Sequence, residues 1–167
     1  MKYAYDFDTL YRHVGSICVR ATDLEHELED SVVLLAGGLH TDSIVRGQRG
    51  SNLISALRRL MNDGAVSSRD TERIRTLAKR SEKLLGARDQ IVHSVWMKTN
   101  QNEPGFITGT HTKASKTTQT MWSLEMLAQV RRDLEETQTV LGTVVHNAVA
   151  ASQGWGLLPE DDLPDWL

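Results

Sequence analysis

The sequence has little cysteine and no long apolar run, and each scarcity excludes a class of protein. Cys18 is the only cysteine among the 167 residues, so the chain cannot form an internal disulfide, as expected in a reducing cytoplasm. No stretch approaches the roughly 20 apolar residues that span a membrane. The opening run MKYAYDFDTLYRH has no apolar core, so it does not read as a secretory signal. We therefore predict a cytoplasmic protein with no membrane partner.

Motifs for metals and for nucleotide phosphates are missing as well. The six histidines are scattered, without an HExxH motif or a Cys/His cluster, so we expect no metal site. No glycine-rich loop precedes a predicted helix. Gly37 and Gly38 instead follow one, where a helix C-cap is the simpler explanation. The sequence therefore predicts no metal and no cofactor.

The charge is modest in sum and uneven in distribution. The net charge is −3, yet residues 1–45 carry −5, residues 46–116 carry +8 and residues 117–167 carry −6. Such a basic zone can bind a polyanion such as RNA. Alternatively, helices of opposite charge face and neutralise one another. The sequence leaves both explanations open.

Apolar residues recur at steps of three and four along most of the chain, which predicts amphipathic helices. Long helices are expected at about 8–36, 68–97 and 123–151, and a short one at 52–62. Ser67 or Ser68 and Ser123 are candidate N-caps, and Gly37-Gly38 and the run NDG at 62–64 are candidate helix ends.

The segments between and after these helices are polar. Residues 99–120 are rich in threonine and predict a polar loop or a small hairpin around 105–112. The predicted fold is therefore all-α: an up-down bundle of three long helices and one short helix. It forms one domain over residues 1–152, followed by an irregular acidic tail over residues 153–167.

The run RDQIVHS, residues 88–94, places charged groups where a buried stripe is expected. On a helical wheel, Arg88 falls inside the apolar cluster, and Asp89 and His93 share a face on its margin. A buried unpaired guanidinium would cost several kcal/mol. Three arrangements avoid that cost: pairing with a carboxylate such as Asp89, a head group that extends to water, or a cleft at a bound anion or a subunit interface.

These residue types also suit phosphodiester chemistry. An arginine offers a rigid fork of donors for phosphate oxygens, and a histidine exchanges a proton near neutral pH. Asp89 can orient His93 or accept a hydrogen bond from a ribose hydroxyl. Arg88, Asp89 and His93 are therefore candidate catalytic residues.

The run RDQIVH, residues 88–93, and the following SVW resemble the Arg-x4–6-His signature of the HEPN superfamily. The resemblance implies a helical bundle that forms a homodimer, with the two motifs facing each other across a cleft. It also implies a metal-independent endoribonuclease, often a toxin or an antiviral effector, in which Arg88 and His93 catalyse and Asp89 assists. Members silenced by a nucleotidyltransferase antitoxin carry a tyrosine two residues after the histidine, where this chain has Val95.

RNA would be guided by the basic zone, and we select five residues of it as candidate RNA contacts: Arg46, Arg49, Arg73, Arg80 and Lys83. On the wheel, Arg73, Arg80 and Lys83 leave the apolar stripe and face outward. A solvated helix face would look the same. The lack of clustered aromatic residues argues against a base-stacking platform.

Two other functions compete with the ribonuclease. The acidic tail and the regular stripe of the first helix also suit a non-catalytic interaction module, such as an antitoxin, an immunity protein or an adaptor. A bundle that binds a nucleotide or small molecule, with Arg88 on a phosphate, is the third candidate. A cognate antitoxin or other regulatory protein is a further expected partner of a toxin.

Overall fold

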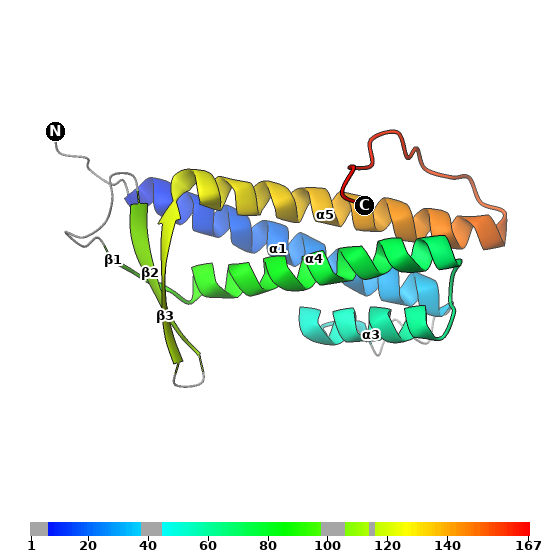
Figure 1. The fold of residues 1–167 in the computed structure, drawn as a ribbon, viewed down its shortest axis with the longest axis horizontal. Helices are drawn as coiled ribbons and strands as arrows, with labels where there is room; N and C mark the ends of the chain where they lie inside the picture. The colour runs from blue at the N-terminus through cyan, green and yellow to red at the C-terminus, as the bar shows by residue number, and fades with distance from the viewer. Residues whose placement is uncertain (1–6, 38–44, 98–105, 114–115) are drawn as a thin grey trace. The chain divides into compact units, whose positions relative to one another are not determined.

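The computed structural model describes residues 7–37, 45–97, 106–113 and 116–167. The elements in these residues, in chain order, are α1 (Phe7–Ala36), α3 (Gly50–Asn62), α4 (Ser68–Val92), β1 (Val95–Met97), β2 (Phe106–Lys113), β3 (Lys116–Ser123) and α5 (Leu124–Gln153) (Figure 1).

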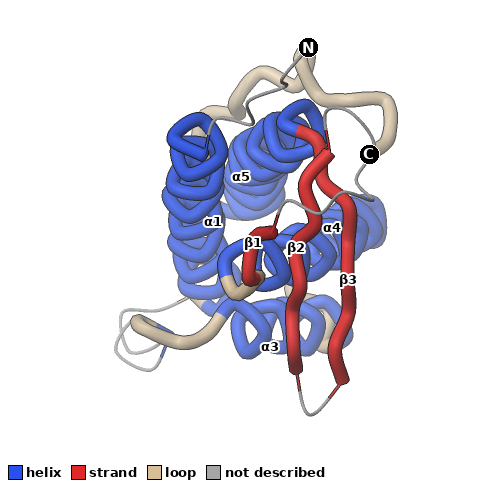
Figure 2. The backbone as a smooth tube through the Cα atoms, turned by 90° about the vertical axis from the view of Figure 1, so that its left-hand side faces the viewer, coloured by secondary structure: helices blue, strands red, loops and turns tan. Residues whose placement is uncertain are grey.

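The prediction of an all-α fold was wrong, because the chain also forms a three-stranded antiparallel sheet of order β1-β2-β3 (Figure 2). The β2–β3 hairpin pairs residues 106–113 with residues 116–123, beyond the small hairpin expected at 105–112. Its strands FITGTHTK and KTTQTMWS are dense in threonine, a β-branched residue that favours strands. The fold is therefore mixed, with helices and an antiparallel sheet.

Helix α4 ends earlier than its apolar stripe suggested. It was expected to reach residue 97, but α4 ends at Val92, and residues 95–97 form β1 against β2. The Ser94 hydroxyl donates a hydrogen bond to the carbonyl oxygen of Gln90, which satisfies one carbonyl of the last turn. Val95 and Trp96 continue the stripe in sequence, but they belong to a strand.

The predicted helix caps were confirmed. The backbone N–H of Asp70 donates to the Ser67 hydroxyl, which itself donates to the Asp70 carboxylate at 2.6 Å. The Ser123 hydroxyl accepts from the N–H of Met126, so it caps α5. Gly37 follows α1 with a φ of 73°, the left-handed conformation that ends helices.

The chain forms two compact units. Unit 1 comprises Met1–Ala21 and Leu84–Leu134, and unit 2 comprises Thr22–Lys83 and Glu135–Leu167. Each unit has buried apolar side chains of its own. Those of unit 1 come from α1, α4, the sheet and α5, and include Leu10, Ile17, Ile91, Ile107, Trp122 and Leu127. Those of unit 2 include Leu24, Leu28, Leu53, Leu57, Ile74, Leu77, Leu141 and Val144.

Within unit 2, α3 lies beside the first part of α4 (Figure 1). Two side-chain contacts join the pair: Arg58 donates to Glu82 at 2.6 Å, and Arg75 donates to Asn62 at 2.9 Å. Leu53, Ile54 and Leu57 of α3 are fully or almost fully buried, because its apolar side chains recur on one face.

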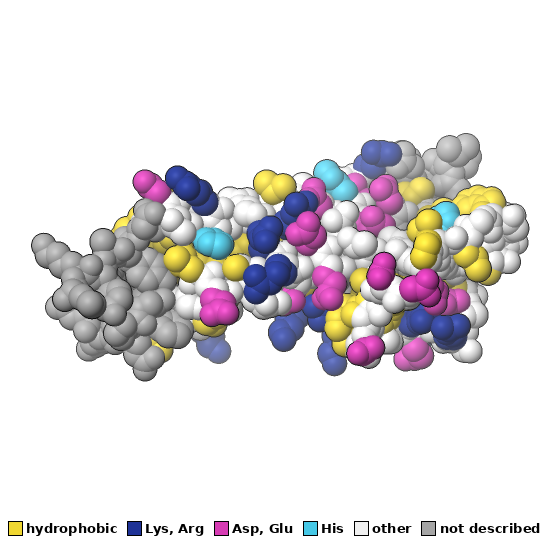
Figure 3. Space-filling view, turned by 90° about the horizontal axis from the view of Figure 1, so that it is seen from above, with side chains coloured by type: hydrophobic (Ala, Val, Ile, Leu, Met, Phe, Trp, Pro, Cys, Tyr) yellow, Lys and Arg dark blue, Asp and Glu magenta, His cyan; other side chains and the backbone are white. Residues whose placement is uncertain are grey.

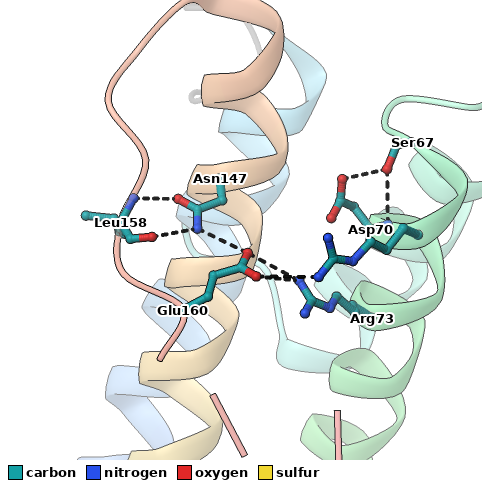
Figure 4. Close-up of polar contacts among 7 residues, drawn as sticks. Ser67, Asp70, Arg73, Asn147, Leu158 and Glu160 are labelled. Carbon is teal, nitrogen blue, oxygen red and sulfur yellow. Dashed lines mark hydrogen bonds and ion pairs between the residues drawn. The ribbon is translucent and has the colours of Figure 1, made fainter. Parts of the chain in front are cut away.

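The residues after α5 adopt no helix or strand, and they contact α4 and α5 within unit 2 (Figure 4). Leu158 and the Asn147 side chain exchange two hydrogen bonds, with donor–acceptor distances of 2.7 and 3.0 Å. The Glu160 carboxylate accepts from Asn147 at 3.3 Å and from Arg73 at 3.1 and 3.2 Å. These contacts hold the pKa of Glu160 below its ordinary value, the bond from Asn147 contributing most. Glu160, the first acidic residue of the tail, is therefore bound to other residues of unit 2.

One carboxyl in unit 2 lies in a place that disfavours its charge. Burial raises the pKa of Glu27 above its ordinary value of 4.5, and the nearby charge of Asp30 raises it further. Gly142 makes room for this group, since a Cβ there would lie 3.0 Å from the Glu27 Oε1. The folded protein therefore disfavours the charged form of Glu27.

We expect Glu27→Gln to raise the melting temperature at pH 7. A group whose pKa is raised on folding favours the folded state below the unfolded pKa of 4.5, and that advantage is lost as pH rises through the folded pKa. The gain should therefore shrink as the pH falls to 4.5. Calorimetry across this range tests it, with Asp161→Asn as an exposed control. An equal or lower melting temperature at pH 7 would contradict the assignment.

Candidate functional site

The last turns of α4 carry the arginine that the helical wheel placed on its inward side. The Arg88 side chain is only 24% exposed, and its Nη1 lies 3.0 Å from Oδ1 of Asp89, whose side chain is 47% exposed. Of the three arrangements that the sequence left open, pairing with Asp89 is therefore present. The carboxylate offsets the desolvation of the guanidinium and fixes its position at the end of α4.

His93 follows directly after α4 and still keeps helical spacing. Its backbone N–H donates to the Asp89 carbonyl oxygen at 3.1 Å. Because this is an i to i−4 hydrogen bond, His93 lies one helical turn beyond Asp89 on the same face, as the sequence predicted. His93 is exposed, so its imidazole can reach a ligand in solution.

A glycine lets strand β2 approach this end of α4. A Cβ built on Gly109 would lie 3.0 Å from Ser94 Oγ, 3.2 Å from Ser94 Cβ and 3.4 Å from Trp122 Cδ1. Only a residue without a side chain fits between those two neighbours without displacing one of them. The close approach of β2 to the residue after His93 therefore depends on Gly109.

Strand β2 also carries a second histidine, His111. His111 lies two residues beyond Gly109, on the same side of β2, because side chains alternate along a strand. Its ring centroid is 6.4 Å from that of His93, and the two ring planes are tilted by 36°. Its Nδ1 is buried and has no hydrogen-bond partner among the described residues. Unit 1 therefore places Arg88, Asp89, His93 and His111 at one end of α4.

This second histidine was missed at the sequence level. His111 stands in a threonine-rich segment that was expected to be a loop or a small hairpin. The alternation around it is a strand signal, but no local signal says that β2 pairs with β1 and approaches Ser94. The strand pairing that determines this position is long-range.

The candidate RNA contacts all lie in unit 2, and two of them are used in internal pairs. The Arg73 side chain is 18% exposed and bound to Glu160. That of Arg80 is 26% exposed and donates to Glu136 at 2.8 Å and to the Thr137 hydroxyl at 2.9 Å. Its guanidinium also lies 4.2 Å from the ring centroid of Trp166, a cation–π contact. Both arginines were expected to face outward, yet they tie the tail and α5 to α4.

Arg46, Arg49 and Lys83, the other three candidates, are exposed. On the face drawn in Figure 3, Lys and Arg side chains lie beside Asp and Glu side chains, so they form no continuous basic surface there. The pairs of Arg73 with Glu160 and of Arg80 with Glu136 neutralise part of the basic zone within unit 2.

Unit 2 also has a surface pocket that the sequence did not single out. Its volume is about 410 Å³, and it lies where α3 and α4 meet, lined by Arg58, Asn62, Arg75, Lys79 and Glu82. Arg58 is paired with Glu82, and Arg75 with Glu72, so two of its three cations already have carboxylate partners. The pocket is therefore a weaker candidate than the cluster of unit 1.

Within the described ranges, no three His, Cys, Asp or Glu side chains are grouped so that they could hold a metal ion. No helix in these ranges combines the length and the hydropathy required to cross a bilayer.

Searches with protein-family models, curated proteins and solved structures found no match to this chain. The resemblance to the HEPN superfamily therefore depends on the motif at residues 88–93 alone, and the function has to be argued from the site itself.

We expect Gly109→Val to destabilise unit 1, because its side chain must displace Ser94 or Trp122. Overpacking of this kind costs about 1–3 kcal/mol of unfolding free energy. Chemical denaturation followed by tryptophan fluorescence measures that loss. Gly156→Val is the matched control, since a Cβ at Gly156 meets no atom within 4 Å. Equal stability of the two variants would contradict the close approach at Gly109.

Proposed function

We propose that the chain is a metal-independent endoribonuclease that cleaves RNA by attack of a 2′-hydroxyl on the adjacent phosphorus. The observation that carries the proposal is the three-quarters buried Arg88, ion-paired with Asp89, together with an exposed histidine one helical turn after Asp89. The motif's resemblance to the HEPN superfamily supports the same function, with the role of a toxin or an antiviral effector.

Each residue has a defined part in this reaction. Arg88 stabilises the negative charge that develops on the non-bridging phosphate oxygens, an effect of about 3–4 kcal/mol by analogy with oxyanion donors. Asp89 holds the guanidinium in position through the 3.0 Å contact. His93 transfers a proton, which accelerates such reactions by about 10²–10⁴-fold. Exposed Arg46, Arg49 and Lys83 are proposed contacts to RNA phosphates.

The proposal includes a homodimer in the cytoplasm, silenced by a cognate antitoxin or another regulatory protein. One face of the sheet supports dimerisation, because Val95, Met97 and Met121 are exposed there. Their register partners share that face of the antiparallel sheet. Apolar side chains grouped in this way mark an interaction surface. Sedimentation at the mass of one chain would contradict the dimer.

A non-catalytic interaction module is the second candidate, and the same exposed sheet face favours it. The tail argues less strongly for it than the sequence suggested, because Glu160 binds Arg73 and Asn147 of its own unit. The two functions differ in one simple observation: a module leaves RNA intact.

We expect His93→Ala to lower the rate of RNA cleavage by about 10²–10⁴-fold, because the proton-transfer group is lost. Purified protein is incubated with RNA in EDTA, and the products are tested for 2′,3′-cyclic phosphate ends. His26→Gln replaces an exposed histidine of unit 2 and should cleave like the wild type.

The companion variant Arg88→Leu separates a structural role from a catalytic one. A structural ion pair alone predicts a lower melting temperature with normal cleavage, whereas the proposal predicts that cleavage is lost. Unchanged cleavage by His93→Ala would remove the catalytic claim.

A further inference from the structure

We infer that His111 is a second catalytic residue, and that His93 and His111 of one protomer divide the acid and base roles. The inference rests on the endoribonuclease function proposed above and deepens it. The motif at residues 88–93 supplies one histidine per chain, so its two proton transfers would need a second protomer. Strand β2 supplies the second imidazole within the same unit.

The spacing of the two rings suits a phosphodiester linkage. Their centroids are 6.4 Å apart. Within the described residues, the two rings form no hydrogen bond with each other. A general acid or base must come within about 2.6–3.2 Å of its oxygen. Two imidazoles at this separation can each reach one oxygen of a phosphate group that binds beside them.

The burial of the two rings differs in a way that fits substrate binding. His93 is exposed, whereas His111 is half-buried, with its Nδ1 enclosed and without a partner among the described residues. An enclosed imidazole nitrogen without a hydrogen bond destabilises the folded protein, and such groups in native structures often have a catalytic role. The strand therefore holds the ring in this place at a cost, as functional sites often do.

The two imidazoles can supply both proton transfers that the cleavage requires. One neutral imidazole takes the proton of the 2′-hydroxyl, and the 2′-oxygen forms a bond to phosphorus. The bond from phosphorus to the 5′-oxygen breaks on the opposite side, and the other ring, as imidazolium, gives its proton to that oxygen. The products are a 2′,3′-cyclic phosphate and a 5′-hydroxyl. Proton exchange with water restores the two rings.

Arg88 complements the two histidines. It lies five residues before His93, with its guanidinium held by Asp89 at 3.0 Å. The non-bridging oxygens gain charge while both protons are in transfer, so a fixed cation at this end of α4 stabilises that state. Gly109 acts as a positioning residue, because it permits the approach of β2 that brings His111 to His93.

The test uses an RNA in which sulfur replaces the 5′-bridging oxygen at one linkage. A thiolate leaves without being protonated, so this substrate needs a base and no acid. We expect His93→Ala and His111→Ala each to slow cleavage of ordinary RNA by about 10²–10⁴-fold. The sulfur-containing RNA should restore one variant, the one that lost the acid, and leave the other slow. His26→Gln should cleave both substrates like the wild type.

Folding is checked by the affinity of each variant for a 2′-deoxy oligonucleotide, which cannot be cleaved. His111→Gln replaces His111→Ala if the alanine variant does not bind it. Independently of any variant, the imidazole proton signals of both His93 and His111 in the wild type should shift when this oligonucleotide is added. A His111 signal that does not move would overturn the inference.

The outcomes separate this inference from the proposed function. Normal cleavage by the His111 variants together with loss in His93→Ala overturns the role of His111 and leaves the ribonuclease standing. Rescue of both variants by sulfur, or of neither, also overturns the division of roles. Wild-type protein that leaves RNA intact overturns both proposals.

Discussion

The candidate site depends on the absence of a side chain at Gly109. Because a Cβ there would lie 3.0 Å from Ser94 Oγ, a larger residue at this position would force Ser94 or the strand to shift. The close approach of β2 places His111 near His93, which follows the end of α4 that carries Arg88 and Asp89.

The local features of the fold could be predicted from the sequence, and the long-range ones could not. Ser67, Ser123 and Gly37 were found as caps because capping depends on a few neighbouring residues. The end of α4 was missed because Val95 and Trp96 continue the apolar spacing of the helix. What ends the helix is the pairing of β1 with β2, whose partner residues lie 11 to 15 positions further along the chain.

In the candidate site, too, the local features were predicted and the long-range ones were not. Arg88, Asp89 and His93 could be found because they share one helical face, and the Arg88–Asp89 contact was among the arrangements considered. His111 was missed, because its position depends on the pairing of β2 with β1, which no local pattern in the sequence indicates. The outward orientation of Arg73 and Arg80 was also misjudged, since a helical wheel contains neither the tail nor α5, the segments that bind them.

Charge in this protein serves two purposes. In unit 2, Arg58, Arg73 and Arg80 each face a carboxylate, so part of the basic zone is neutralised by neighbouring acidic residues. Such partly exposed pairs contribute little individually, about 0–1 kcal/mol, but they orient the tail and the helices. In unit 1, the Arg88–Asp89 pair instead lies next to two histidines. The combination of a fixed cation with two titratable rings distinguishes this site from the structural pairs.

The most direct test of this account is a crystal structure of the wild-type protein with the uncleavable 2′-deoxy oligonucleotide. We predict one phosphate group within hydrogen-bond distance of Arg88, His93 and His111 of the same protomer. Nucleic acid bound only elsewhere, or a phosphate held by two copies of His93 with His111 turned away, would contradict the account.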